Sequence, residues 1–212
     1  MPLLLLLVPA LLLAQRSVPV DNEWARVVVA TSKPGPEGQM HKHDMNRVMV
    51  YLDKGAQKLR FQEGGAKDIS FAAGEVKWDP KGGLHTSQNT GGAAFRVVEI
   101  ELKKPGGKAT YSDIDPMKVA PGTYRVDLEN DQVRVLRARL EPKQSVPLHE
   151  HSLPRVVLAL TEVDFDVTSA DGKVNKLRAK PGDTIFGTGV HHREVNVGDK
   201  PAELLLVEFK GQ

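Results

Sequence analysis

Two closely spaced histidines occur twice in this chain, each time inside the same longer pattern. In both copies one residue separates the histidines, and an arginine and a valine follow at the same distance. The copies are His41-Lys42-His43 with Arg47-Val48, and His149-Glu150-His151 with Arg155-Val156. Side chains two positions apart on a β-strand point to the same face, so each pair can present two imidazoles to one metal ion. The repetition predicts two metal sites.

The repeat extends well beyond the histidines and predicts two homologous domains. Residues that recur at the same offset include Asn22/Asn130, Arg26/Arg134, Leu52/Leu160 and Gly74/Gly182. A chain of 212 residues is long enough for two small domains, and the internal repeat favours two over one. We predict a first domain over residues 18–104, a linker over 105–121 that opens with Pro and Gly, and a second domain over 122–212.

Both halves are predicted to be all-β. Short stretches rich in Val, Leu and Ile, such as residues 26–30, 48–52 and 156–160, are separated by turns that contain Gly or Pro. No long stretch has the 3.6-residue periodicity of an amphipathic helix. The pattern favours a barrel or a sandwich in each half.

The chain opens with an apolar run that predicts export. Residues 3–13 consist mainly of Leu and precede Ala14, a small residue typical of a signal-peptide cleavage site. The run is too short for a membrane-spanning helix, which needs ~20 residues. We predict a signal peptide over residues 1–14 and a mature protein in the periplasm or outside the cell, without a membrane anchor. The alternative is a short amphiphilic N-terminal segment, because no Lys or Arg precedes the run.

The composition narrows the classes of partner. The 29 basic and 27 acidic residues nearly balance, and aromatic residues make up only 5% of the chain. A nucleic-acid-binding surface normally needs a basic patch or a platform of aromatic side chains, so no nucleic-acid partner is expected. The chain has no Cys, which excludes disulfides. We expect a small-molecule ligand or substrate, and the composition leaves the oligomeric state open.

A third histidine follows each pair, and here the chain resembles a known family. The motifs are Gly35-x5-His41-x-His43 and Gly74-x5-Pro80-x-Gly82-x2-His85-x3-Asn89 in the first half, and Gly189-x2-His192-x3-Asn196 in the second. They resemble the two motifs of the cupin superfamily. The chain as a whole resembles a bicupin, and it is similar to small bacterial cupins. The resemblance implies two double-stranded β-helix (jelly-roll) barrels, each holding a metal by His, His, Glu and His.

The glutamate of that family motif is missing from both halves. The positions four or five residues after the second histidine hold Arg47 and Val48, or Arg155 and Val156. Counting back from the turn glycine Gly55 places Val48 at the ligand position, with Arg47 on the opposite face of the strand. Three histidines per half therefore remain as predicted ligands: His41, His43 and His85, and His149, His151 and His192.

Two glutamates near the ends of the halves are alternative ligands. Glu99 and Glu208 lie on the last predicted strand of each half. Their neighbours Val98 and Ile100 indicate that the other face of that strand is the buried one, which disfavours both glutamates. His191 is expected to be exposed, because adjacent strand residues face opposite ways and the motif spacing points His192 inward.

Three neutral imidazoles favour a catalytic metal site over a structural one. Structural zinc usually takes four protein ligands, whereas three ligands with an exchangeable water are typical of catalysis. The divalent metal could be Fe, Mn, Ni, Cu or Zn. Three-histidine cupins resemble certain dioxygenases, so we predict an exported metal-binding bicupin of dioxygenase type that acts on a small anionic or oxygen-rich molecule. Oxalate-decarboxylase chemistry is disfavoured by the missing glutamates, and a non-catalytic metal- or ligand-binding protein is the alternative.

Two further features of the sequence bear on the metal sites, namely a pair of arginines and the loop before the third histidine. Arg47 and Arg155 are candidate substrate-binding residues, since a guanidinium contacts carboxylates with two hydrogen bonds; an ion pair at the barrel rim is the alternative. The second half has Thr188 in place of Pro80 and a loop shorter by one residue. Because proline restricts φ, the loop before His85 should be better preorganised. We therefore predict one metal in each half, the first bound more tightly.

Overall fold

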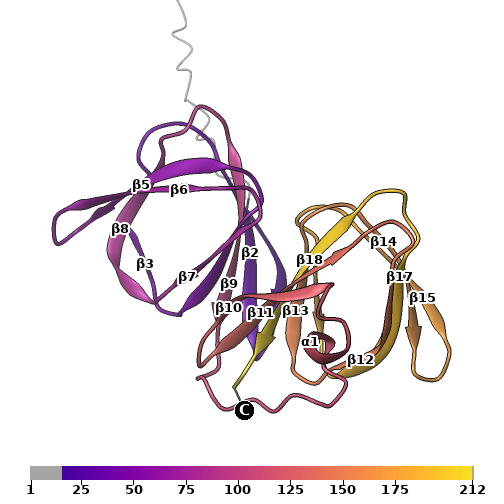
Figure 1. Cartoon of the computed structure of the whole chain (residues 1–212). Helices are drawn as coiled ribbons and strands as arrows, with labels where there is room; N and C mark the ends of the chain where they lie inside the picture. Colours follow the sequence, from indigo (N-terminus) through magenta and orange to yellow (C-terminus); the bar gives the residue numbers. More distant parts are fainter. Residues whose placement is uncertain (1–15, 212) are drawn as a thin grey trace, which may run out of the picture.

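The computed structural model describes residues 16–211, and the predicted signal peptide at residues 1–14 lies outside the described part. The described residues form antiparallel strands and a single short helix, α1 (Pro116–Val119), which confirms the all-β prediction. No helix among residues 16–211 is long and apolar enough to cross a membrane. Figure 1 shows two barrels side by side, coloured indigo to magenta and orange to yellow.

The first barrel consists of two sheets. A five-stranded sheet, here called the first inner sheet, has the order β1-β2-β9-β4-β7, and a four-stranded outer sheet has the order β3-β8-β5-β6. The strands are β1 (Arg16–Asp21), β2 (Ala25–Ser32), β3 (His41–His43), β4 (Arg47–Tyr51), β5 (Gly55–Phe61), β6 (Ala66–Phe71), β7 (Glu75–Asp79), β8 (Gly82–Asn89) and β9 (Phe95–Leu102).

The second barrel repeats this arrangement strand for strand. Its inner sheet has the order β10-β11-β18-β13-β16 and its outer sheet β12-β17-β14-β15. The strands are β10 (Tyr124–Glu129), β11 (Val133–Leu140), β12 (Ser145–His151), β13 (Arg155–Ala159), β14 (Val163–Ser169), β15 (Val174–Ala179), β16 (Thr184–Gly187), β17 (Val190–Asn196) and β18 (Ala202–Phe209). The double-stranded β-helix prediction is thereby confirmed for both halves.

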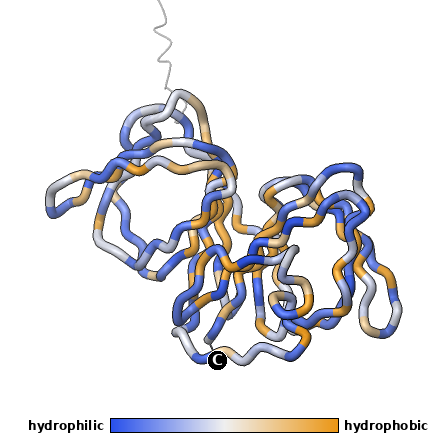
Figure 2. Tube along the Cα trace, viewed as in Figure 1, coloured by the Kyte–Doolittle hydropathy of each residue, from blue (hydrophilic) through white to orange (hydrophobic). Residues whose placement is uncertain are grey.

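The two inner sheets pack against each other and share one apolar core. Val48, Val98 and Ile100 of the first barrel are fully buried in it, as are Val156 and Leu205 of the second. Figure 2 shows hydrophobic segments along the strands at this junction. Burying a side chain of this size stabilises a fold by about 1.5–3 kcal/mol. Each inner sheet is therefore buried on both faces, one against the other barrel and one around its own barrel interior.

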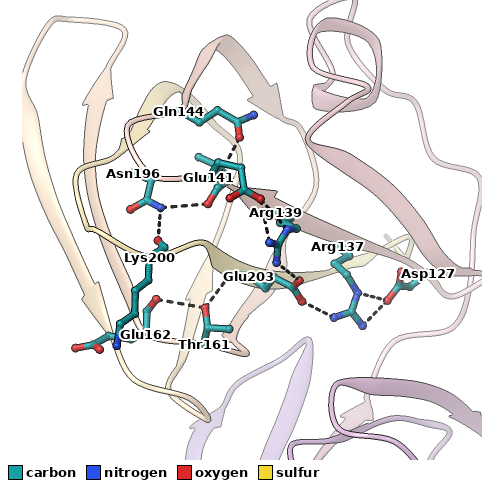
Figure 3. Close-up of polar contacts among 11 residues, drawn as sticks. Asp127, Arg137, Arg139, Glu141, Gln144, Thr161, Glu162, Asn196, Lys200 and Glu203 are labelled. Atoms are coloured by element: carbon teal, nitrogen blue, oxygen red, sulfur yellow. Dashed lines mark hydrogen bonds and ion pairs between the residues drawn. The ribbon is translucent and has the colours of Figure 1, made fainter.

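Hydrogen bonds from arginines and close packing at turn glycines connect the two barrels at the edges of the junction. Arg137, held between Asp127 and Glu203 in Figure 3, also donates from Nη2 to the carbonyl of Gly74 in the first barrel at 2.6 Å. Gly74 has a φ of 76°, which favours glycine. A Cβ at Gly74 would lie 3.7 Å from Leu160 Cδ1 across the junction.

The opposite side of the junction repeats these contacts with the barrels exchanged. Arg96 donates to the carbonyl of Pro181 at 3.3 Å, and a Cβ at Gly182 would lie 3.1 Å from Leu52 Cδ1. The recurring leucine and glycine of the sequence repeat therefore serve the contact between the barrels.

Candidate metal centres

The first cluster of histidines lies inside the first barrel. His41 and His43 on β3 and His85 on β8 each place one ring nitrogen within 4.8 Å of the others. His41 Nδ1 and His85 Nδ1 contact the carbonyls of Gln39 and Gly83 at 2.9 and 3.0 Å. An Nδ1–H that donates to a carbonyl fixes the tautomer and leaves Nε2 free to coordinate.

The second cluster has the same construction. His149 and His151 on β12 and His192 on β17 also lie within 4.8 Å of one another through one nitrogen each. His149 Nδ1 contacts the carbonyl of Pro147 at 2.9 Å, whereas His151 Nδ1 contacts Glu208 Oε1 at 3.2 Å. A carboxylate behind a histidine is the common way in which proteins orient a metal ligand.

Burial distinguishes the two clusters. In the second barrel the exposed fraction is 0% for His149 and 1% for His151, while His43 in the first barrel is only partly buried. The segment over residues 105–121 lies beside the histidine strand of the second barrel, because the backbone N–H of Glu150 donates to the carbonyl of Ile114 at 2.9 Å and Met117 packs against the apolar core of that barrel.

Three of the imidazoles, those of His43, His149 and His151, are held in the neutral form that coordination requires. Burial lowers the pKa of His149 and takes that of His151 well below its usual value. In the first barrel, burial and the neighbouring Arg47 charge lower the pKa of His43 to about 3. Neutral nitrogens that converge in a barrel interior fit a divalent transition metal.

The prediction that Val48 takes the ligand position, with Arg47 on the opposite face, was wrong. Val48 lies in the core between the barrels, and Arg47 lies inside the first barrel. Arg47 Nη1 is 2.9 Å from His43 Nε2 and donates to Glu99 Oε2 at 2.5 Å, and Nη2 pairs with Asp79. The error has a physical cause, because the second barrel covers the outer face of this sheet. The apolar residues of β4 therefore face the junction between the barrels, and Arg47 faces the interior of the first barrel.

The same reversal places carboxylates inside the first barrel. Val98 and Ile100 are buried as expected, but in the junction, so Glu99 and Glu101 face the interior near His43. Glu101 accepts a hydrogen bond from Arg26 at 3.0 Å. The sequence analysis disfavoured Glu99 and missed Glu101.

Strand register relates the glutamates of the two barrels. Arg47 on β4 is opposite Glu101 on β9, and Arg155 on β13 is opposite Glu208 on β18. Glu208 is therefore the counterpart of Glu101, and Leu206 takes the place of Glu99.

Arg155 has a different environment from Arg47. It is 6% exposed and donates from Nη1 to the carbonyl of Thr188 at 2.7 Å, and burial lowers its pKa. Its buried Nε has no hydrogen-bond partner within residues 16–211, and the guanidinium forms no ion pair there. Arg47 therefore matches the ion-pair interpretation, although inside the barrel, whereas Arg155 remains available to an anion.

Glu208 is the most enclosed carboxylate of the second barrel. It is fully buried between His151 and Arg134, whose Nε donates to Glu208 Oε2 at 2.6 Å. Arg134 is held in turn by Asp115 at 2.6 Å and by the ring of Tyr111 at 3.5 Å. Burial raises the pKa of Glu208.

A second buried carboxylate, Glu194, was missed by the sequence analysis. Glu194 Oε2 lies 3.7 Å from His192 Nε2, and Tyr124 donates to Glu194 Oε1 at 2.7 Å. The signal was present, because Glu194 follows His192 by two residues on β17 and must share its face. Adjacent His191 is half-exposed and pairs with Glu150, as its outward position predicts.

One surface hollow lies away from both clusters. It has a volume of about 510 Å³ and is bordered by Leu52, Arg96 and Arg178 at the junction of the barrels. Its arginines are already paired, Arg96 with Asp53 and Arg178 with Asp164. The histidine clusters are therefore the stronger candidates for chemistry.

Comparison with known proteins relates the chain to solved structures by its fold. No protein-family model and no curated protein sequence matches the chain. Among solved structures, AerE from Microcystis aeruginosa is 11% identical with a TM-score of 0.65, and each chain is covered to 87%. A cupin 2 conserved barrel domain protein from Leptotrichia buccalis is 11% identical with a TM-score of 0.55, covering 93% of this chain and 89% of that one. The chain therefore has the fold of the cupin protein that it matches.

A third structure similar in fold is a single-residue variant of oxalate decarboxylase from Bacillus subtilis. It is 15% identical with a TM-score of 0.62, and 89% of this chain and 69% of that chain are covered. Another structure of that decarboxylase is described by its Mn(II) centres. At such low sequence identity, these structural matches establish only the shared fold. The indication of metal binding comes from the histidine clusters themselves.

Proposed function

We propose that this bicupin is an exported metalloenzyme of dioxygenase type that acts on a small carboxylate bound in the second barrel. The observation that carries the proposal is Arg155, a buried guanidinium without a carboxylate partner among residues 16–211, in a barrel whose three histidines bring one ring nitrogen each within 4.8 Å of the others. An unpaired buried charge is costly, so a charged group left in this state favours an anionic ligand.

The residues of the second barrel divide the work. Arg155 would hold the substrate carboxylate through its free guanidinium edge. His149, His151 and His192 would hold the metal, with Glu208 fixing the orientation of His151. A bound Fe(II) or similar ion would supply the site for dioxygen, both atoms of which enter the product. The barrel walls and residues 111–120 would keep bulk water from that space.

Mn(II) and Fe(II) are the metals to test first. Imidazole suits most late transition metals, whereas the nearby carboxylates favour the harder ions Mn(II) and Fe(II). The Mn(II) centres of the decarboxylase similar in fold make Mn(II) a reasonable probe. Ni, Cu and Zn remain alternatives.

Dioxygen uptake by metal-loaded protein tests the proposal. The substrate panel should pair small carboxylic acids with their neutral amides, which have the same shape but no charge. Arg155→Met is expected to raise KM for an active acid by about 10- to 150-fold, as for loss of a charged hydrogen bond worth about 1.5–3 kcal/mol. Arg155→Lys should recover part of the loss. Tight metal and ligand binding without any uptake would instead support the non-catalytic binding protein.

Export needs a separate test. Mass spectrometry of the protein from its native host is expected to find a chain that begins near Gln15, after cleavage behind Ala14. An intact N-terminus on cytoplasmic protein would reject this part of the proposal and leave the metal chemistry untouched.

A further inference from the structure

Glu194 is a buried anion without a Lys or Arg partner in the described part of the chain. It is 6% exposed, and within residues 16–211 its only ionic contact is the 3.7 Å approach to His192. Buried carboxylates of this kind are normally paired or bound to a metal.

The position of Glu194 relative to the histidines fits a shared metal. Its Oε2 approaches His192 Nε2, while its Oε1 accepts from the Tyr124 hydroxyl, which lies 3.4 Å from His149 Nε2. Two ligands held about 2.1 Å from one ion are about 3.0–3.5 Å apart at right or tetrahedral angles. The observed 3.7 Å to His192 is close to that spacing, and the carboxylate would turn toward His149 and His151 to share their ion.

We propose that Glu194 is a carboxylate ligand of the metal in the second barrel and replaces the motif glutamate whose place Arg155 occupies. The ligand set there becomes three histidines and one glutamate, and the Tyr124 hydroxyl holds the other carboxylate oxygen. This inference rests on the metal-binding part of the proposed function. It does not depend on the reaction.

In the first barrel the described carboxylates near the histidines, Glu99 and Glu101, are held by arginines, with Arg26 donating to Glu101 at 3.0 Å. The residue two positions after His85 is Ser87. Its nearest alternative, Glu99, is held by Arg47 at 2.5 Å, and Arg47 also contacts His43. The first site is therefore a three-histidine site, and the two sites should differ in their preference for Mn(II), which favours oxygen ligands.

Titration of Mn(II) into the mature chain tests the inference. His41→Ala and His85→Ala first disable the first cluster, so that the signal comes from the second. Calorimetry gives the Mn(II) affinity, and electron paramagnetic resonance of the loaded protein reports the symmetry of the ligands. The test variants are Glu194→Gln, Glu194→Asp and Tyr124→Phe, and Glu150→Gln is the matched control on the outer face.

The expected results separate a ligand from a supporting residue. Glu194→Gln should weaken Mn(II) binding by more than 100-fold and change the resonance spectrum, and Glu194→Asp should recover part of the affinity. Tyr124→Phe should cost about 10- to 100-fold, as for a partner behind a ligand. Glu150→Gln should leave the affinity unchanged.

The melting temperature of the metal-free variant distinguishes a metal ligand from a structural residue, because loss of a structural residue would lower it. Because the amide oxygen of Gln can still accept from the Tyr124 hydroxyl, metal-free Glu194→Gln should melt within a few degrees of the parent. Mn(II) binding within threefold of the parent, or a melting temperature several degrees lower without metal, would overturn the inference while leaving three-histidine metal binding intact. No Mn(II), Fe(II) or Zn(II) binding by the parent would overturn both.

Discussion

Both clusters consist of three histidines, but the charges and the burial around the two clusters differ. In the first barrel Arg47 is neutralised by Glu99 and Asp79, and His43 remains partly exposed. In the second, Arg155 has no acidic partner within the described residues, and the first two histidines are fully enclosed. Duplication kept the groups that bind a metal, while the charges that decide what else can enter diverged.

The segment between the barrels contributes to that difference. Asp115 and Tyr111 enclose Arg134, which fixes Glu208 behind His151. The corresponding Arg26 is about one-third exposed, with Glu101 and Asp21 as partners. A histidine backed by a rigid carboxylate loses less freedom on binding a metal. The second site should therefore be the tighter one, in contrast to the order expected from Pro80 alone.

Removal of one histidine from each cluster should give the largest effect. His192→Ala is expected to abolish the tighter of two Mn(II) binding events, and His85→Ala the weaker, because each removes one of only three imidazoles. Calorimetric titration of both variants and the parent measures the order directly. Equal sites, or a tighter event that survives His192→Ala, would contradict the ranking of the barrels.

Substitution of the matched glutamates should show the difference in stability. Glu208→Ala leaves Arg134 buried with Asp115 alone, so we expect a loss of about 3 kcal/mol in the free energy of unfolding, at the low end for a broken buried pair. Glu101→Ala should cost about 1 kcal/mol, because Arg26 can turn to solvent. Urea unfolding of the metal-free proteins compares them. Equal losses would mean that the connecting segment does not stiffen the second barrel.

Acid should destabilise the metal-free protein through its neutral histidines. Burial lowers the pKa of His43, His149 and His151 relative to about 6.5 in the unfolded chain. Below pH 6.5 the unfolded state therefore binds more protons than the folded state. The free energy of unfolding is at its full value above pH 6.5 and falls as the pH drops, and the contribution of His43 to this fall ends at about pH 3. Urea midpoints at pH 7.5, 6.5 and 5.5 test this. Replacing either His43 or His151 by Gln should reduce the slope by a similar amount, because both stay neutral in the folded chain over this pH range.

The fold and the six histidines could be predicted because they leave local signals. Short β-rich stretches, turn glycines and a motif repeated in register need no knowledge of the partner surface. The orientation of the inner strands could not be predicted in this way, because it depends on the second barrel covering the first. Val98 and Ile100 were correctly expected to be buried, and their burial in the junction turned Glu99 inward.

Two other site residues illustrate different reasons for a miss. The separation of Arg155 from any carboxylate of the described chain follows from Leu206 standing where the first barrel has Glu99, a comparison that needs the strand register. Glu194 could have been found, since it alternates with His192 on a strand. Its meaning depends on the enclosure of the barrel, which no spacing in the sequence reveals.

The smallest expected effect concerns Pro80, on which the opposite ranking depends. A proline that fits its backbone stabilises a protein by about 0.4–1 kcal/mol through the unfolded state, so Pro80→Ala should cost no more than that. If enclosure and carboxylate support decide the affinities, the variant should change Mn(II) binding at the first site by less than threefold. Thr188 provides the matched control: Thr188→Ala keeps the carbonyl that accepts from Arg155 and should leave the second site unchanged. A loss above tenfold at the first site in Pro80→Ala would show that loop stiffness, rather than the surroundings of the histidines, sets the order of the two barrels.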